Sequence, residues 1–415
     1  MVDSGARGRT AGSPADPPLH RNPDYRRYWV ARAAAVFGSQ VTYISFPLLA
    51  LTIAESPLGA SFVTVITYGV PFLASLPAGA LADHFSRRRI MVLADLANAA
   101  IYLALGVAIM AGSLSIELLA FAAAAVAASS AAYLSASTAL LPSLVGVSKV
   151  RRAASVNDSR DFAIALVGPI VGAGLFLYRP ELPFLANGGA FLLSGAVIST
   201  VRAGRGRTSQ AGERLRLRTA LRGLQIVGRD RSLRVALMAL SLLSFVLTMN
   251  FFSVVAYFET RGETIGAGIV VAAQALGGLL GGLLAAGLST RLNPRVVYLA
   301  QASMWLITSV TMILHQQVWT MAIVLCLTWM VTPSMRAVYQ GYVAEAVVEE
   351  ERGRVASAAQ LATSTMSPLG VLVAGILSGD GSLAPFWTMA GVAGATIMLL
   401  LVGTSRRRDR FLEAA

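Results

Sequence analysis

The sequence predicts an all-α membrane protein whose twelve transmembrane helices form two pseudo-symmetric six-helix bundles. The first observation behind this prediction is composition: the 415 residues are 55% hydrophobic and 13% charged, whereas about a quarter of the residues of a soluble domain are charged. The second is that apolar segments long enough to cross ~30 Å of hydrocarbon recur along the chain. The third is a weak repeat between the two halves. Helices are the expected spanning element, because every backbone amide needs a partner inside the lipid.

Twelve apolar segments are predicted to span the membrane. They are residues 28–53, 60–82, 90–112, 116–143, 155–178, 183–201, 233–258, 265–288, 296–315, 318–343, 355–378 and 384–404. An even number of spans places both termini on the same side. The polar first residues lack the apolar stretch of a cleaved signal peptide, and we expect them to form a cytoplasmic tail.

The basic residues predict the orientation. The chain has 34 lysine and arginine residues against 21 acidic ones, a net charge of +13. With a cytoplasmic N-terminus, all of the basic residues except Arg179 and Arg261 lie in cytoplasmic segments or at the adjoining helix ends, as the positive-inside rule requires. Because the arginines fall between apolar segments, their charge favours membrane topology over nucleic-acid binding. Abundant Arg, Ala and Gly indicate a GC-rich bacterial genome, so we expect a multi-pass protein of the bacterial cytoplasmic membrane.

The predicted organisation is a cytoplasmic tail at 1–27, an N-terminal bundle at 28–201, a basic cytoplasmic linker at 202–232, a C-terminal bundle at 233–404 and a tail at 405–415.

Within the linker, apolar residues recur at helical spacing. They are Leu217, Leu221, Leu224 and Val227. This pattern favours an amphipathic helix on the inner membrane surface. The alternative is a solvated basic linker that only sets topology.

Two patterns of the first half return in the second. "ALADHFSRRR" (80–89) is echoed by "GLSTRLNPR" (287–295), and "LVGPIVGAG" (166–174) by "TMSPLGVLVAG" (365–375). Such internal symmetry is typical of transporters built from repeated bundles.

Several function classes lack the residues they need. The only cysteine, Cys326, has no partner for an internal disulfide, and the three histidines are scattered, so no metal site is expected. The phosphate-binding pattern GXXXXGK[ST] is absent, and the only lysine is Lys149, so we expect no ATP-driven pump. No nucleophile and base converge at membrane depth. We therefore expect no enzyme, no catalytic residues and no cofactor.

The loop between the second and third spans concentrates charge in a tight turn. It reads "GALADHFSRRRIM" at residues 79–91. It resembles the signature Gly-x-Leu-Ala-Asp-x-x-Gly-Arg-Arg/Lys of the major facilitator superfamily, which implies the two-bundle fold predicted above. The matching residues are Gly79, Leu81, Ala82, Asp83, Arg87 and Arg88, and the departure is Ser86 in place of the second glycine.

The resemblance implies that this loop is a conformational latch. Asp83 would face the start of the eleventh span, where a helix N-terminus offers partial positive charge. Arg87 and Arg88 would shape the loop and pair with an acid in the third span, here Asp95. Paired charges between bundles stabilise contact only while the bundles meet, so they suit a two-state element. The alternative is that the arginines only anchor the topology.

The fifth span resembles an exporter motif. Gly168, Pro169 and Gly172 match Gly-Pro-x-x-Gly-Gly, and Ala173 departs at the last position. Small residues let helices approach closely, and ordinary membrane packing is the alternative explanation.

Further stretches resemble the drug-efflux branch of macrolide and enterobactin exporters. They are "RNPDYRRYW" (21–29), "PAGALADHFSRRRIMVLADL" (77–96), "TALLPSLV" (138–145) and "LRGLQIVGRDRSLRVAL" (221–237). The branch often has an acid after the glycine of the first span, where this chain has Ser39. This chain also lacks the arginine that many drug–proton antiporters have in the fourth span.

Asp158, Arg160 and Asp161 are the proton-coupling candidates. The two acids are three residues apart on one helical face, and a carboxylate pair beside an arginine can take up and release protons. The alternative is that they sit in the first turn of a helix with Asn157 or Asp158 as N-cap.

Polar and aromatic residues near the middle of spans are candidates for the substrate cavity. They are Gln40, Tyr43, Tyr133, Asn250, Gln274, Trp329, Arg336 and Gln360. Arg336 would either meet an anionic substrate or extend to the cytoplasm. A cavity with few charges suits an amphipathic, largely apolar solute.

These residues predict a monomeric secondary transporter that exports small, largely apolar molecules by alternating access in exchange for protons. The alternatives are a dedicated exporter of a siderophore or of a metabolite of the host, and an importer of the same fold. The expected partners are a small-molecule substrate, protons and the lipid bilayer, and no nucleic acid.

Overall fold

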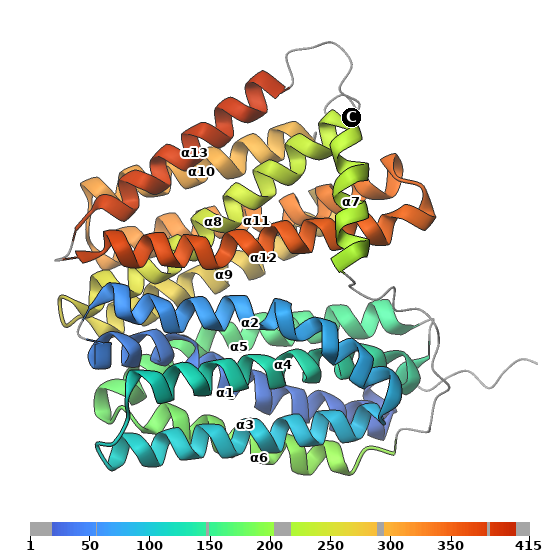
Figure 1. The fold of residues 1–415 in the computed structure, drawn as a ribbon, viewed down its shortest axis with the longest axis vertical. Coiled ribbons are helices and arrows are strands. Elements are labelled where there is room, and N and C mark those ends of the chain that lie inside the picture. Colours follow the sequence, from blue (N-terminus) through green and yellow to red (C-terminus); the bar gives the residue numbers. More distant parts are fainter. Residues whose placement is uncertain are drawn as a thin grey trace, which may run out of the picture.

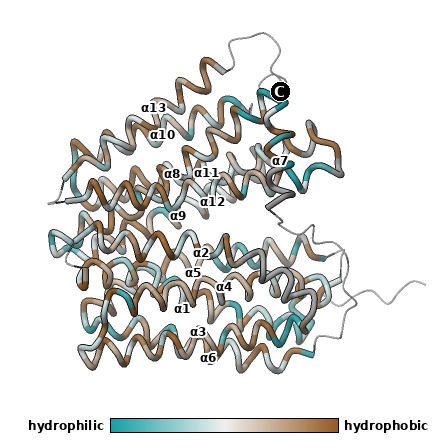
Figure 2. Tube along the Cα trace, in the orientation of Figure 1, coloured by the Kyte–Doolittle hydropathy of each residue, from teal (hydrophilic) through white to brown (hydrophobic). Residues whose placement is uncertain are grey.

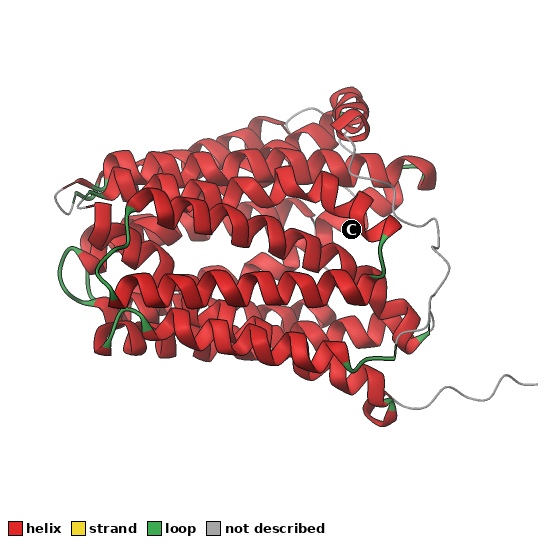
Figure 3. Ribbon diagram, turned by 60° about the horizontal axis from the view of Figure 1, so that its bottom comes forward, coloured by secondary structure: helices red, strands yellow, loops and turns green. Residues whose placement is uncertain are grey.

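The computed structural model describes residues 19–54, 56–146, 149–202, 217–288, 294–379 and 382–403. Over these ranges every regular element is a helix, and no strand occurs in them (Figure 3). The all-α prediction is therefore confirmed for the part of the chain that the structure describes.

Each predicted span coincides with one long helix. After a short 3-10 turn, η1 (Leu19–Arg21), the helices of the first half are α1 (Pro23–Ala54), α2 (Pro57–His84), α3 (Arg87–Met110), α4 (Ile116–Val145), α5 (Val150–Tyr178) and α6 (Leu182–Ser199). A shorter helix, α7 (Leu217–Arg229), precedes the second half. There follow α8 (Arg231–Glu259), α9 (Thr264–Leu288), α10 (Pro294–Leu314), α11 (Val318–Ala346), α12 (Glu349–Leu377) and α13 (Ala384–Gly403).

Eleven of the described helices are long and apolar enough to cross a membrane, and the described part of α2, Pro57–Pro71, is a shorter apolar segment. Large apolar side chains are exposed along the outside of both bundles, among them Leu93, Phe121 and Trp319. In Figure 2 the hydrophobic colour runs along the helices and the hydrophilic colour gathers toward one end. An exposed apolar surface of this extent needs an apolar environment, which the lipid supplies.

The helices pack as two bundles, α1–α6 and α8–α13 (Figure 1). In the first bundle α1 packs on α5 and α6, α2 on α4, and α3 on α4 and α6. In the second, α8 packs on α12 and α13, α9 on α11, and α10 on α11 and α13. Every pair of the first list recurs six spans later, so the weak repeat of the sequence corresponds to a repeated packing scheme.

The two ends of the molecule differ in charge. The end where α1, α3, α5, α8 and α12 begin carries arginines such as Arg26, Arg88, Arg152, Arg229 and Arg352. We call it the arginine-rich end. It lies at the right of Figure 1, together with α7. We call the other end, where α1 and α5 finish, the opposite end.

The bundles meet mainly through two pairs of helices, α5 with α9 and α2 with α12. Near the opposite end, Gly375 of α12 packs directly on Ser61 of α2. Further along the same pair, the Cβ position of Gly69 lies 3.8 Å from the Pro368 ring. Toward the arginine-rich end the two bundles separate (Figure 1). The molecule is therefore closed at the opposite end.

The linker helix α7 packs on α12. Gly223 packs against the backbone carbonyl of Arg354 in α12, Val227 is buried, and Arg222 and Arg229 are exposed. The structure thus confirms a helix over Leu217–Arg229. Its described apolar side is covered by another helix of the protein. Leu217 and Leu221 have side chains outside the described set.

Candidate functional site

The fifth-span motif lies where three helices meet. Gly168 of α5 packs on Gln40 of α1, and Gly172 packs on the Val41 carbonyl one residue further along α1. On another side of α5, Gly268 of α9 approaches the Pro169 carbonyl, where its Cβ position lies at 3.1 Å. A Cβ at Gly172 would overlap the α1 backbone, one at Gly168 would overlap the Gln40 side chain, and one at Gly268 would crowd α5. Small residues at these positions therefore let α1, α5 and α9 approach closely. One face of α5 thereby holds the first bundle together while another meets the second bundle.

An aromatic cluster bridges the bundles halfway along α1. The ring of Tyr43 lies 4.5 Å from the ring of Phe251 in α8, measured between centroids. The Tyr43 hydroxyl is 3.3 Å from that of Tyr68 in α2. Tyr43 is nevertheless 40% exposed. Because it contacts helices of both bundles, its exposed part faces the space between them. That Tyr43 lines the substrate cavity stays a prediction.

The sequence reasoning did not identify Phe251 and Tyr68. Both are aromatic residues near the middle of spans, which is a weak signal, since such residues more often pack than bind ligands. Only the contact with Tyr43 singles them out.

Asp158 lies on the face of α5 that looks toward the second bundle. It precedes Pro169 by eleven residues, about three helical turns, so the two residues share a face. On the same face, Phe162 lies 3.4 Å from the Cβ position of Gly278 in α9. Asp158 is one turn beyond this contact and is exposed. It therefore lies on the face of α5 that meets α9, on the side of the Phe162 contact toward the arginine-rich end.

Two other cavity candidates lie near the meeting of the bundles. Trp329 of α11 is half-buried, lies 3.8 Å from the Cβ position of Gly278, and has an indole nitrogen without a hydrogen-bond partner. Gln360 of α12 is exposed, and its amide donates to the Ser364 hydroxyl at 2.9 Å. Gln360 lies within about 80° of the α12 face that contacts α2, given 100° of rotation per residue.

Three candidates are buried inside a bundle, so the structure corrects the prediction that they line a cavity. The Gln274 amide donates to Asn250 at 3.4 Å, and Asn250 donates to the Met312 sulfur at 3.6 Å. Both residues are buried among α8, α9 and α10. Tyr133 is buried inside the first bundle. A polar side chain within a span can be satisfied by a hydrogen bond to a neighbouring helix, so its presence does not require a cavity.

The coupling candidates form a charged cluster between α1 and α5. The Arg160 guanidinium donates two hydrogen bonds to Asp161, at 2.9 and 2.7 Å, and one to the Trp29 carbonyl at 3.0 Å. Arg32 of α1 donates to the other oxygen of Asp161 at 3.4 Å. Asp161 is thus held by two arginines, whereas no hydrogen bond or ion pair of Asp158 occurs among the described residues.

The N-cap interpretation of this cluster is wrong. α5 begins at Val150, with Lys149 at the N-cap position and no side-chain cap. Asp158 and Asp161 therefore lie more than two turns inside the helix. They were predicted near the helix start because the apolar part of the span begins only there. The first turn of α5 lies in polar sequence.

The turn between α2 and α3 is shaped within the first bundle. Ser86 is the N-cap of α3 and accepts from the Arg89 amide at 3.4 Å. Arg87 donates to the Ala139 carbonyl of α4 at 2.6 Å, and Arg88 to the Val201 carbonyl after α6 at 2.9 Å. These carbonyls stabilise positive charge at a helix N-terminus, where the macrodipole disfavours it. Ser86, which departs from the family signature, thus has a structural role of its own.

The expected pair of Arg87 with Asp95 is not formed in this structure. Asp95 lies eight residues along the same helix, about 12 Å at 1.5 Å per residue. It is buried and accepts from the Ser194 hydroxyl of α6 at 2.7 Å. The prediction came from the family resemblance, whereas in this structure Arg87 donates to a nearer acceptor, the Ala139 carbonyl of α4.

Some predicted residues fall outside what the structure describes. The side chains of Asp83 and Arg336, and the surroundings of Gly79, belong to this group, although all three residues lie within helices. The contact of Asp83 with the start of α12 therefore stays a prediction.

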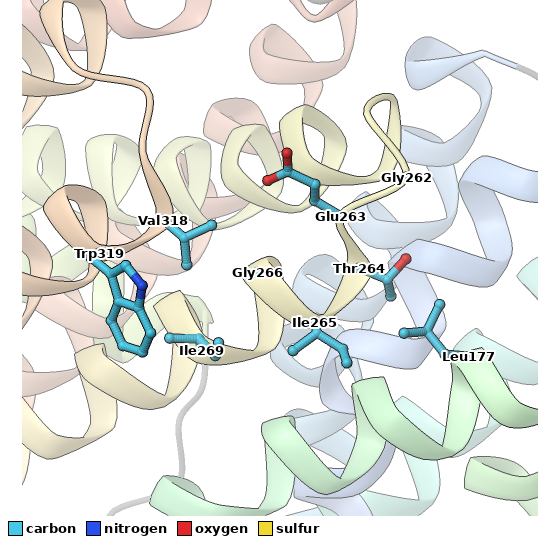
Figure 4. Close-up of a pocket in the computed structure, with 9 residues that line it drawn as sticks. All are labelled: Leu177, Gly262, Glu263, Thr264, Ile265, Gly266, Ile269, Val318 and Trp319. Atoms are coloured by element: carbon cyan, nitrogen blue, oxygen red, sulfur yellow. The ribbon is translucent and has the colours of Figure 1, made fainter.

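Two surface hollows lie at the opposite end. The larger, of about 340 Å³, is lined by Leu177 of α5, by Ile265 and Ile269 of α9 and by Trp319 of α11 (Figure 4). The smaller, of about 210 Å³, lies between the end of α1 and the end of α8. Their position at one end distinguishes both from the surfaces between the bundles that carry Tyr43 and Asp158.

Comparison with known proteins agrees with this geometry. The model of the Major Facilitator Superfamily matches residues 28–266 and 240–415. The chain is 28% identical to the multidrug efflux pump Tap of Mycolicibacterium fortuitum over 396 aligned residues. The alignment covers 93% of this chain and 96% of that protein. It is also 28% identical to the multidrug efflux pump Tap of Mycobacterium tuberculosis, over 87% of this chain and 88% of that protein.

Solved structures share the fold at low identity. A bacterial homologue of the iron transporter ferroportin, in an inward-facing state, superposes with a TM-score of 0.75 at 16% identity, covering 94% of this chain and 100% of that one. The nucleoside transporter NupG superposes with a TM-score of 0.74 at 11% identity, covering 92% and 99%.

Proposed function

Because the chain belongs to the Major Facilitator Superfamily and is a secondary transporter, we propose that it exports small, largely apolar molecules across the cytoplasmic membrane in exchange for protons. The observation that carries the proposal is the arrangement of the bundles, which touch at the opposite end and separate toward the arginine-rich end. Similarity to Tap pumps along nearly the whole chain supports export.

The surfaces between the bundles favour an amphipathic solute. Tyr43, Phe162 and Trp329 present aromatic rings there, and Gln360 adds a polar amide. On α5, the described part of this surface also carries one exposed charged residue, Asp158. Apolar walls with a few polar groups retain a largely apolar molecule by burial and orient it by hydrogen bonds.

The transport cycle we propose moves the bundles as two rigid bodies, residues 28–201 and 233–404, joined by the linker 202–232. The arginine-rich end faces the cytoplasm, as the positive-inside rule requires. The arrangement seen here is then the state open to the cytoplasm. Closing that end would bring Asp83 of α2 toward the start of α12, and the latch would form only in that state.

Proton exchange is proposed to supply the energy. Asp158 and Asp161 differ in their surroundings, although they are one turn apart. Asp161 is engaged by Arg32 and Arg160, and Asp158 is open to the space between the bundles. Exchange of a proton for substrate at this cluster would link binding to the movement of the first bundle, which contains α1 and α5, against the second.

The test is dye export in a bacterium that lacks its own efflux pumps. Cells that express the protein should accumulate less ethidium than cells with an empty vector, and a protonophore should abolish the difference. The Asp83→Asn variant should export more slowly, because the latch loses its charge. Equal accumulation with and without the protein, across ethidium and a panel of apolar antibiotics, would overturn the multidrug proposal.

A further inference from the structure

A second acidic site lies inside the first bundle, away from the surfaces that face the other bundle. Asp95 of α3 is fully buried, and Asn98, one turn further along α3, is 1% exposed. Ser194 of α6 and Tyr133 of α4 are also buried. Sequence reasoning gave Asp95 a role only as partner of Arg87, and the structure leaves it without that role.

Three oxygen atoms of this cluster are buried without a hydrogen-bond partner. They are Oδ1 of Asp95, Oδ1 of Asn98 and the hydroxyl of Tyr133. The other oxygen of Asp95 accepts from Ser194 at 2.7 Å. Buried polar atoms are nearly always satisfied, so several orphans in one place indicate a missing partner.

Packing brings Asp95, Ser194 and Tyr133 to one place, and Asn98 follows Asp95 by one turn of α3. Gly195 of α6 lies against Asp95, with its Cβ position 3.3 Å from the Asp95 Cβ. Ser129 of α4 donates to the Ala94 carbonyl at 3.1 Å, which sets α4 against this part of α3. Tyr133 follows Ser129 by one turn, and Asp95 and Ser194 are among its neighbours. The cluster is therefore enclosed by α3, α4 and α6.

The partner that this cluster needs is positive. A buried carboxylate without a cation is costly, by several kcal/mol even after relaxation of the surroundings. The packed helices α4 and α6 offer hydroxyl groups, from Tyr133 and Ser194, and no cation in their described parts. Arg32 of α1 lies within reach of Tyr133, but it donates to Ser137 and Asp161.

We propose that Asp95, Asn98, Tyr133 and Ser194 form a second binding site for a monovalent cation coupled to transport, in addition to the proton exchange proposed at Asp158 and Asp161. The cation is a proton on the carboxylate or a sodium ion among the four oxygens. All four side chains present oxygen, the ligand type that hard cations prefer. The statement that the cation is coupled to transport rests on the proposed function. The site itself follows from the buried acid and its unpartnered neighbours.

Side chains connect this site to the charged cluster on α1 and α5. Tyr28 and Arg32 of α1 are neighbours of Tyr133. The Tyr28 hydroxyl is 2.8 Å from that of Ser137, to which Arg32 donates at 3.3 Å, and Arg32 also contacts Asp161 at 3.4 Å. A change of charge at Asp95 would therefore alter the field at Arg32. That residue ties α1 to α5, the helix that meets the second bundle.

Infrared difference spectroscopy of the purified full-length protein tests the site without transport. If a proton is bound, lowering the pH should produce the carbonyl stretch of a protonated carboxylic acid that disappears in Asp95→Asn and stays in Glu117→Gln, an exposed control at the opposite end. If sodium is bound, adding NaCl should shift a carboxylate band and raise the melting temperature in the wild type, and neither should happen in Asp95→Asn. The absence of both signals would overturn the proposal.

Transport then tests coupling. In proteoliposomes, Asp95→Asn should lose at least about tenfold of ethidium uptake driven by a pH or sodium gradient, while exchange of ethidium across the membrane without a gradient persists. Asn98→Ala should weaken gradient-driven uptake by a smaller factor. Gradient-driven uptake that is unchanged in Asp95→Asn would refute coupling at this site. A wild-type protein that moves no ethidium at all would instead contradict the proposed function.

Discussion

At the scale of single residues, small side chains decide where helices meet. Gly172 and Gly174 lie two positions apart in α5, yet a side chain at Gly172 would meet the Val41 carbonyl of α1, while one at Gly174 would meet nothing within 4 Å. The motif that resembles an exporter signature is thus a packing requirement at the junction of α1, α5 and α9.

We expect Gly172→Val to destabilise the protein by about 1–3 kcal/mol, the usual cost of overpacking a tight interface. Gly174→Val is the matched control and should leave stability nearly unchanged, because that position is exposed. Thermal unfolding of both variants in detergent measures the difference. Equal melting temperatures for the two variants would contradict the packing scheme.

Ser86 provides a second prediction at this scale. Its side chain caps α3 by accepting from the Arg89 amide. Ser86→Ala should cost about 1 kcal/mol of stability, while Ser86→Gly should cost only a few tenths. The glycine variant restores the residue type of the family signature and serves as the control. A melting temperature that falls more with glycine than with alanine would argue against the cap.

At the scale of helices, the apolar pattern predicted the existence and order of twelve long helices, eleven of which are long and apolar enough in their described parts to cross a membrane. It placed most helix ends within a few residues, because the apolar run sets the length of a membrane helix. It failed where helices extend into polar sequence: α5 begins at Val150 and α12 at Glu349, each five or more residues before the predicted start. Hydropathy reports the part of a helix that lies in lipid and misses the part beyond it.

The site was less predictable than the helices. Tyr43 and Asp158 lie on surfaces between the bundles, whereas Asn250 and Gln274 pair with each other inside the second bundle. Hydropathy does not distinguish these two situations, because a polar residue in a span is either exposed to a cavity or satisfied by a neighbouring helix. The choice depends on which helices are neighbours.

The linker helix gives a prediction at this scale. Gly223 packs against the Arg354 carbonyl and lies 3.0 Å, at its Cβ position, from the Ala358 Cβ. Gly223→Val should lift α7 from α12 and speed hydrogen exchange of the α7 amides. The same substitution at Gly228, where nothing lies within 4 Å, should leave exchange slow. Equal exchange in the two variants would show that α7 does not depend on this contact.

At the scale of the whole molecule, the two bundles form a device with one closed end. The closed end is held by contacts of α5 with α9 and of α2 with α12, and these contacts must break for the molecule to open there. Alternating access therefore predicts that a covalent bond across either pair stops transport. The chain suits this test, because Cys326 is its only cysteine and can be replaced.

The measurement that tests the central claim most directly combines such a bond with a proton gradient. In inside-out vesicles with an acidic interior, protein carrying Cys326→Ser, Ala173→Cys and Gly268→Cys should take up ethidium only after reduction. The Ala173 Cβ lies 2.9 Å from the Cβ position of Gly268, about 1 Å less than the usual Cβ spacing of a disulfide, so α5 and α9 must move slightly apart for the bond to form. The matched control carries Gly174→Cys instead of Ala173→Cys, and it should transport with or without reductant. Gradient-driven uptake that continues while the 173–268 disulfide is shown to be intact would contradict the account.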